Sequence, residues 1–281
     1  MKKLSNTIGL FMCVLVVLIS ACSKNPADPA PIPVPPPVNV IDTARVRLKQ
    51  IEIPNLPSPY FEFVYNDSGY ATHINFASNF FKYELEYNNK RISRMTNQIN
   101  GDKLVYQYQN GNVSAIDQYS GITGFRLWHY EFAYDVMQKL VNVKWYVFPS
   151  NGSDSLLEKV ADLKYGADGN LSEYKYSIRM DDGSMQWGST YTFSNYDKKI
   201  NVDDFGMLKQ FFDHLLYLPA VKFQTNNPAS SKISSTVNEF EINYQYQYQG
   251  NLPQAKTTTI RQTKGSDAGR VTTSTTQYSY Y

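Results

Sequence analysis

The sequence predicts an all-β domain, built as an antiparallel meander of repeated aromatic hairpins in a twisted or curled sheet. Two observations lead to this prediction. A phrase in which aromatic and polar residues alternate recurs along the chain, as in "YQYQNGNV" at 106–113 and "YQYQGNL" at 246–252. Each copy then breaks on a short turn rich in Asn, Asp and Gly, residues that accept the positive φ angles of tight hairpins.

Weaker copies of the same phrase fill the region between these two. Strand periodicity places Tyr106 and Tyr108 on one face and Gln107 and Gln109 on the other. One hairpin cannot bury its aromatic face alone, so we expect the copies to lie side by side in a sheet of about a dozen strands that curls or splits into two layers. Each copy is identified by two aromatic or apolar residues that lie two positions apart: Phe63 and Tyr65, Leu85 and Tyr87, Tyr106 and Tyr108, Phe132 and Tyr134, Leu163 and Tyr165, Tyr191 and Phe193, and Tyr246 and Tyr248.

One segment, 201–219, departs from the strand pattern. Asn201 or Asp203 can cap the start of a helix there, and Pro219 marks its end. The spacing predicts one amphipathic helix near 203–218 that covers an end or a face of the sheet, the alternative being a loop with accidental periodicity. The residues at helical spacing are Phe205, Leu208, Phe212, Leu215 and Leu216.

Residues 1–21 predict a signal peptide. Lys2 and Lys3 precede an apolar run at 8–19, which is shorter than the roughly 20 apolar residues that a membrane-spanning helix needs. Small residues then lead directly to Cys22. This pattern resembles the lipobox of bacterial lipoproteins, and the resemblance implies cleavage before Cys22 and lipidation of its thiol and its new amino end. The alternative is an ordinary signal peptide followed by a chance cysteine.

The stretch 22–41 predicts a lipidated cysteine followed by a proline-rich linker. Seven prolines fall between residues 26 and 37, and such a run favours extended polyproline II at about 3.1 Å per residue. The linker would hold a single all-β domain, 42–281, away from the lipid surface. The sequence contains only Cys13 and Cys22, so we expect no disulfide, cysteine nucleophile or cysteine metal site in that domain.

Charge argues against nucleic acid as a partner. Removing Lys2 and Lys3 from the 27 basic residues leaves 25, which equals the 25 acidic residues. Nucleic-acid binding favours a basic stripe, and electrostatic attachment to a membrane surface favours a basic patch. We therefore expect membrane attachment through the N-terminal lipid alone.

Late in the chain, the stretch "SNYDKKINVDDFGMLKQFF" precedes "TNNP" and a closing tyrosine hairpin. With the hairpin phrases, these residues resemble an uncharacterised family of YD-repeat-like lipoproteins of Gram-negative bacteria, a domain of unknown function, over about 45–281. Members of that family usually have proline where this chain has Val202. The resemblance implies a mainly-β fold, and it brings neither an activity nor catalytic residues.

Catalytic patterns are weak. His73, His129 and His214 lie in unrelated segments without metal-ligand spacing. The acid pairs at 181–182 and 203–204 fit a hairpin turn and a helix start better than a glycosidase pair. Because no nucleophile elbow or phosphate loop is present, we expect no enzyme activity, no cofactor and no metal.

The aromatic residues offer one candidate binding site. Trp128, Trp145 and Trp187 could form a platform on which a sugar stacks. The alternative is that the aromatic residues pave the buried face of the sheet.

We therefore expect a lipid-anchored protein of the outer membrane, on its periplasmic or cell-surface side. Its function would be non-enzymatic, as a binding module for a glycan or an envelope protein or as a structural component. One alternative is a carrier that holds an apolar ligand in the curled sheet, and another is a hydrolase with a hidden site.

Overall fold

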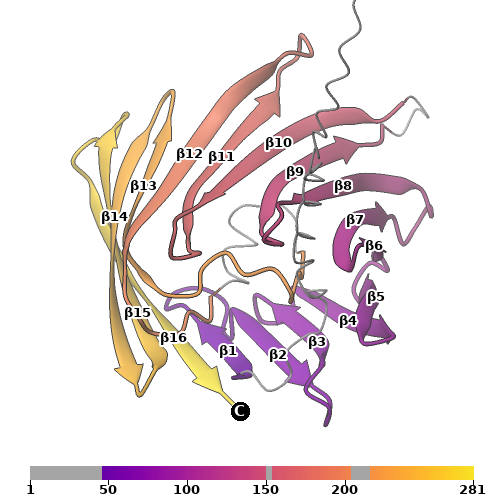
Figure 1. Cartoon of the computed structure of the whole chain (residues 1–281), viewed down its shortest axis with the longest axis horizontal. Coiled ribbons are helices and arrows are strands. Elements are labelled where there is room, and N and C mark those ends of the chain that lie inside the picture. The colour runs from indigo at the N-terminus through magenta and orange to yellow at the C-terminus, as the bar shows by residue number, and fades with distance from the viewer. Residues whose placement is uncertain (1–45, 150–153, 204–215) are drawn as a thin grey trace, which may run out of the picture. The chain divides into compact units, whose positions relative to one another are not determined.

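The computed structural model describes residues 46–149, 154–203 and 216–281. These residues contain sixteen antiparallel strands, each hydrogen-bonded to its neighbours in the sequence, and β1 pairs with β16 to close a barrel (Figure 1). The strands are β1 (Leu48–Glu52), β2 (Phe61–Tyr65), β3 (Ala71–Phe76), β4 (Phe81–Asn88), β5 (Arg91–Asn97), β6 (Lys103–Gln109), β7 (Asn112–Tyr119), β8 (Arg126–Tyr134), β9 (Leu140–Val147), β10 (Leu156–Tyr165), β11 (Leu171–Arg179), β12 (Met185–Tyr196), β13 (Pro228–Ser235), β14 (Glu239–Gln249), β15 (Leu252–Lys264) and β16 (Val271–Tyr280).

Closure corrects the predicted architecture. The expectation of a twisted or curled sheet with one helix was wrong, because the structure forms a closed sixteen-strand barrel. The ends of the meander join where Ile51 of β1 faces Tyr278 of β16. Pairing these two strands gives partners to the backbone groups that an open sheet leaves exposed at its edges.

The helix predicted near 203–218 falls mostly on 204–215, which lie outside the described residues. Its described flanks, Asp203 and 216–218, are not helical, and no helix occurs in the part of the chain that the structure describes. That part also contains no helix long and apolar enough to cross a membrane.

Alternation along each strand separates an apolar lumen from a polar outer wall. On β6, Leu104 and Tyr106 are buried, whereas Gln107 and Gln109 are exposed. The same division holds on β4, where Tyr83 and Leu85 are buried between exposed charged residues. The core therefore lies inside the barrel, and the predicted paving of one sheet face by aromatic residues is the lining of the lumen.

Tyrosines at the ends of the repeated phrases join neighbouring hairpins. Each hydroxyl donates a hydrogen bond to a backbone carbonyl near the start of the returning strand in the preceding hairpin. The bonds run from Tyr87 to Ala71 (2.6 Å), from Tyr108 to Ile92 (2.9 Å), from Tyr165 to Leu140 (3.0 Å) and from Tyr196 to Leu171 (2.6 Å). At these four positions, the tyrosine near the end of one hairpin's first strand therefore ties that hairpin to the one before it.

The connection between β12 and β13 enters the lumen. Leu216, Leu218 and Phe223 are almost fully buried, and Tyr106 donates a hydrogen bond to the carbonyl of Tyr217 at 2.9 Å. Figure 1 shows this irregular orange segment crossing the interior before β13 begins. The described part of the connection therefore packs as part of the core.

Two asparagine-rich stretches secure this connection. Asp197 accepts a hydrogen bond from the backbone N–H of Asn227 at 3.1 Å. The side-chain oxygen of Asn170 accepts the backbone N–H groups of Thr225 and Asn226 at 2.8 and 3.0 Å. The first contact joins the "SNYD" and "TNNP" motifs, and the other two join "TNNP" to the turn before β11.

Candidate functional site

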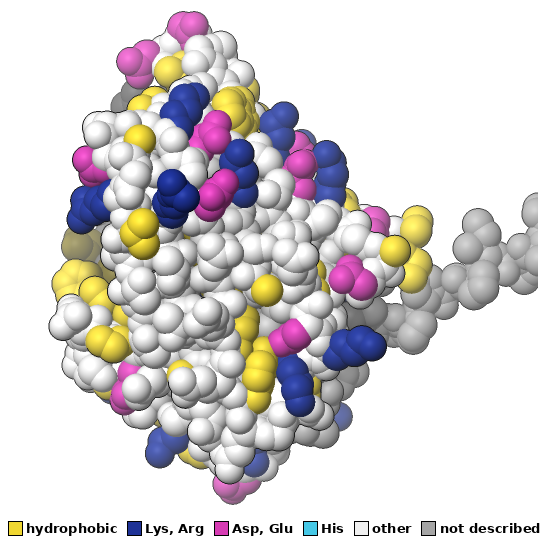
Figure 2. Space-filling view, turned by 90° about the vertical axis from the view of Figure 1, so that its left-hand side faces the viewer, with side chains coloured by type: hydrophobic (Ala, Val, Ile, Leu, Met, Phe, Trp, Pro, Cys, Tyr) yellow, Lys and Arg dark blue, Asp and Glu magenta, His cyan; other side chains and the backbone are white. Residues whose placement is uncertain are grey.

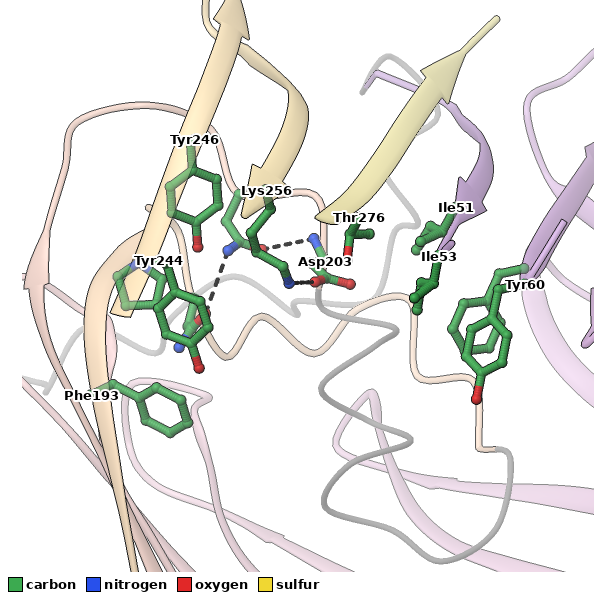
Figure 3. Close-up of a pocket in the computed structure, with 13 residues that line it drawn as sticks. Ile51, Ile53, Tyr60, Phe193, Asp203, Tyr244, Tyr246, Lys256 and Thr276 are labelled. Atoms are coloured by element: carbon green, nitrogen blue, oxygen red, sulfur yellow. Dashed lines mark hydrogen bonds and ion pairs between the residues drawn. The ribbon is translucent and has the colours of Figure 1, made fainter. Parts of the chain in front are cut away.

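A cavity of about 330 Å³ lies in the lumen, against the inner faces of β1, β12, β14, β15 and β16 (Figure 3). Most of its wall is aromatic or aliphatic, and a few polar groups converge on it. Its lining residues are Ile51, Ile53, Tyr60, Phe61, Phe193, Asn201, Asp203, Gln224, Pro228, Tyr244, Tyr246, Lys256 and Thr276.

An ion pair between Lys256 and Asp203 forms the polar centre of the cavity (Figure 3). The side chains are only 17% and 19% exposed. Asp203 also accepts a hydrogen bond from the hydroxyl of Tyr278 at 3.1 Å, and its backbone N–H donates to the side-chain oxygen of Asn201 at 2.8 Å. Oδ2 of Asp203 therefore accepts from both Lys256 and Tyr278, and Asn201 fixes the backbone of Asp203, in surroundings where an unpaired charge would be costly.

Lys256 is a cation in this environment. Burial acts to lower its pKa, but the negative charge of Asp203 and the adjacent tyrosines outweigh burial and raise the pKa above its usual value. The ammonium also lies 5.9 Å from the ring centroid of Tyr244 and 5.9 Å from that of Tyr278, within the range of cation–π attraction.

Several polar atoms of the cavity have bonding capacity left. An ammonium carries three N–H donors, and within the described residues only one hydrogen bond from Lys256 is found, to Oδ2 of Asp203. Oδ1 of Asp203 and the hydroxyl of Tyr246 accept or donate none in the same part of the chain. Burial raises the pKa of Tyr246, so this hydroxyl stays protonated and can donate a hydrogen bond.

Sequence reasoning missed this site. Lys256 pairs across the sheet with Tyr246, and the alternation that points Ile260 inward also points Lys256 inward. The sequence signal that could have found the site is a lysine at an alternate position that faces the same side of the sheet as the aromatic residues. For Asp203 the sequence favours a place at the start of a helix over a catalytic acid pair, and it does not indicate a lysine partner.

The structure does not bring the three candidate tryptophans onto one surface. Trp145 is 1% exposed and packs edge-on against Tyr130 inside the barrel. Trp128 is partly buried against the same core. Trp187 is 39% exposed, pairs with the outward-facing Ser177 and donates a hydrogen bond to Thr190 at 3.0 Å. Cys22, the predicted lipidation site, lies outside the described residues.

The outer wall is mainly hydrophilic. Figure 2 shows the side of the barrel that contains β13 to β15 as mostly uncharged side chains and backbone, with scattered charges and a few hydrophobic side chains. On β14 the outward residues include Asn243, Gln245 and Gln247, all exposed. Elsewhere, ion pairs join neighbouring strands, as between Arg94 and Glu86 at 2.6 Å.

Two acidic residues outside the lumen have structural partners. Asp117 on the wall binds His129 at 2.8 Å and Arg126 at 3.1 Å. Asp182 accepts hydrogen bonds from Ser184 in the turn between β11 and β12. Among the described residues, no group of three His, Cys, Asp or Glu side chains could hold a metal ion.

Comparisons with known proteins identify the fold. No family model matches the chain, and no curated protein matches it. The structure is similar to a porin-like protein from Bacteroides uniformis ATCC 8492, with a TM-score of 0.54, 14% identity, and coverage of 79% of this chain and 89% of that chain. It is also similar to a porin-like protein from Bacteroides vulgatus ATCC 8482, with a TM-score of 0.55, 13% identity, and coverage of 84% and 99%.

A third likeness, to the TcdB2-TccC3-Cdc42 complex, has a TM-score of 0.29 and covers 12% of that chain, too little to inform the fold. Because the two porin-like proteins are only 14% and 13% identical to this chain, the similarity shows the fold and not the function. The chain has the fold of a porin-like antiparallel barrel.

Proposed function

We propose that this chain is a lipid-anchored protein of the cell envelope whose barrel stands in water as a non-enzymatic binding module. The observation that carries the proposal is the polarity of the barrel, apolar inside and hydrophilic outside. Barrels that span an outer membrane have the opposite arrangement, with an apolar outer band about 25 Å tall and a polar interior.

Charged residues on the wall support this reading. Glu86 lies between the inward-facing Leu85 and Tyr87, so its ion pair with Arg94 points outward. A second outward pair joins Lys164 and Glu173 at 2.8 Å. An arginine or lysine facing lipid at the bilayer midplane costs about 2–4 kcal/mol, so a wall with such pairs favours water.

The filled lumen argues against a role as a pore. Sixteen strands are enough to enclose an aqueous channel. In this chain the space contains buried aromatic residues, including Trp145 and Tyr174, together with the segment around Leu216 and Phe223. The inner wall therefore serves as a hydrophobic core that leaves a small cavity.

The anchor is proposed from the N-terminal sequence. Cys22 would carry the lipid, and the proline-rich stretch to residue 41 would separate the barrel from the membrane surface. The porin-like neighbours are consistent with an envelope address, and we place the anchor in the outer membrane.

Binding is the activity that the site favours. The cavity has the mixture of apolar wall and few polar groups that is typical of small-molecule sites, and its volume falls at the lower end of their range of about 300–1,000 Å³. This favours a small ligand held in the lumen, as in a carrier, over a glycan platform made by the three tryptophans.

Lipid labelling tests the anchor. Cells that express the full chain are fed an alkyne-bearing fatty acid, and the purified protein is examined for the label. Wild-type protein should carry it and Cys22→Ala should not, whereas equal labelling of both would overturn the assignment of Cys22.

A further inference from the structure

Among the described residues that line it, the lumenal cavity presents one positive and one negative side chain and therefore no net charge. Lys256 and Asp203 neutralise each other, and Tyr278 donates to the same carboxylate oxygen that Lys256 contacts. A ligand with a single charge would add to this neutral pair a charge that no described lining residue balances. Burying an uncompensated charge is strongly unfavourable, so the site favours an uncharged ligand.

The remaining bonding capacity of the pair suits a ligand with adjacent hydroxyl groups. A hydroxyl both donates and accepts. One hydroxyl can accept from a second N–H of Lys256 while its neighbour donates to Oδ1 of Asp203, so the ion pair stays intact. The hydroxyl of Tyr246, which has no partner within the described residues, adds a third contact.

The aromatic wall supplies the complementary apolar surface. Figure 3 shows the rings of Tyr244, Tyr246 and Phe193 arranged on one side of the ion pair, with Ile51, Ile53 and Tyr60 on the other. A sugar ring has hydroxyls at its rim and an apolar C–H face, so it can pack on such rings while its rim reaches the pair. The electron-rich faces of aromatic rings favour contact with C–H groups.

We propose that this cavity binds an uncharged mono- or disaccharide through the intact Lys256–Asp203 pair and the tyrosine wall. This inference rests on the binding role proposed above and names the ligand class for that site. An amino acid, whose carboxylate and ammonium could contact Lys256 and Asp203, is the competing ligand. It is disfavoured because both of its charges must lose their water on entering the cavity, which costs far more than burying neutral hydroxyls.

The test uses the full chain, purified in a polyoxyethylene detergent because maltoside and glucoside detergents carry sugar. Saturation-transfer NMR is recorded with glucose, galactose, mannose, N-acetylglucosamine, maltose and cellobiose. Glucuronate, glucosamine and phenylalanine serve as charged or zwitterionic comparators. We expect transfer to at least one neutral sugar and weaker transfer to all three comparators.

Variants locate the binding. Tyr246→Phe removes one hydroxyl and keeps the ring, so the dissociation constant should rise about fivefold. The double variant Lys256→Gln and Asp203→Asn keeps the cavity neutral and similar in shape, and binding should be lost. Tyr176→Phe, which alters a lumenal tyrosine outside the cavity lining, should bind as the wild type does. Circular dichroism confirms that each variant is folded.

Three results would overturn the inference. The first is an absence of transfer to every neutral sugar at millimolar concentration, and the second is tighter binding of a comparator. If Tyr246→Phe and the folded double variant both bound sugar normally, the cavity would be the wrong site. Any of these results would leave the anchored, water-facing barrel standing, because its own tests do not depend on a ligand.

Discussion

The tyrosine bonds between hairpins predict a specific loss of stability in Tyr108→Phe. The hydroxyl of Tyr108 donates to the carbonyl of Ile92 at 2.9 Å, and the ring lies 5.4 Å from the guanidinium of Arg91. Phenylalanine keeps the ring and removes only the hydrogen bond. A neutral hydrogen bond contributes about 0.5–1.5 kcal/mol net, so the free energy of unfolding should fall by about 1 kcal/mol.

Urea denaturation followed by circular dichroism measures this change. A barrel of this length loses about 2–4 °C in melting temperature per kcal/mol, so thermal unfolding gives a second reading. The matched control is Tyr70→Phe, since the hydroxyl of Tyr70 makes no hydrogen bond within the described residues. Its effect should stay below about 0.5 kcal/mol.

A second bond of the same kind extends the test. Tyr165 donates to the carbonyl of Leu140 at 3.0 Å on another hairpin, so the double variant Tyr108→Phe and Tyr165→Phe should lose about 2 kcal/mol, the sum of two independent bonds. Equal effects of Tyr108→Phe and Tyr70→Phe would refute the role assigned to the repeat tyrosines.

Two further predictions concern pH and packing. Burial raises the pKa of Tyr83 and of Tyr108 from 10.0 to about 12. Because the folded pKa exceeds the unfolded one, their stabilising contribution is complete below pH 10 and is lost as the pH rises from 10 to 12. The urea midpoint should therefore fall across that window, and a constant midpoint would contradict this. Trp145→Ala should cost about 3–5 kcal/mol in unfolding free energy and the wall substitution Trp187→Ala less than about 1 kcal/mol, and similar losses would contradict the division into lumen and wall.

Local features of the fold were predictable because they depend on neighbouring residues. Asn110 and Gly111 form the expected turn, with φ of 48° and 89°. Period two placed Tyr106 inward and Gln107 outward, as the structure has them.

Closure of the barrel was not predictable from such patterns. It depends on Leu48 facing Tyr280 and Ile51 facing Tyr278, at opposite ends of the domain. No local signal states that two strands so far apart in the sequence will pair, and an alternating segment suits a curled sheet as well as a closed one.

The cavity was missed for a related reason. A lysine among threonines, as in the stretch around Lys256, looks like exposed strand, and only its register with Ile260 indicates that it faces the lumen. Asp203 becomes its partner because the connection after β12 enters the barrel. That entry is a property of the tertiary fold.

We propose that the barrel touches no lipid and is held to the membrane only by its N-terminal lipid. A protease site inserted after Asn39, in the linker, separates the barrel from that anchor. Membranes with the protein are treated with protease and sedimented, and a membrane-spanning porin is the control that stays in the pellet. We expect the barrel to appear folded in the detergent-free supernatant after cleavage and to stay in the pellet without it. A cleaved barrel that remained in the membrane after a carbonate wash would show that the barrel itself is inserted in the bilayer.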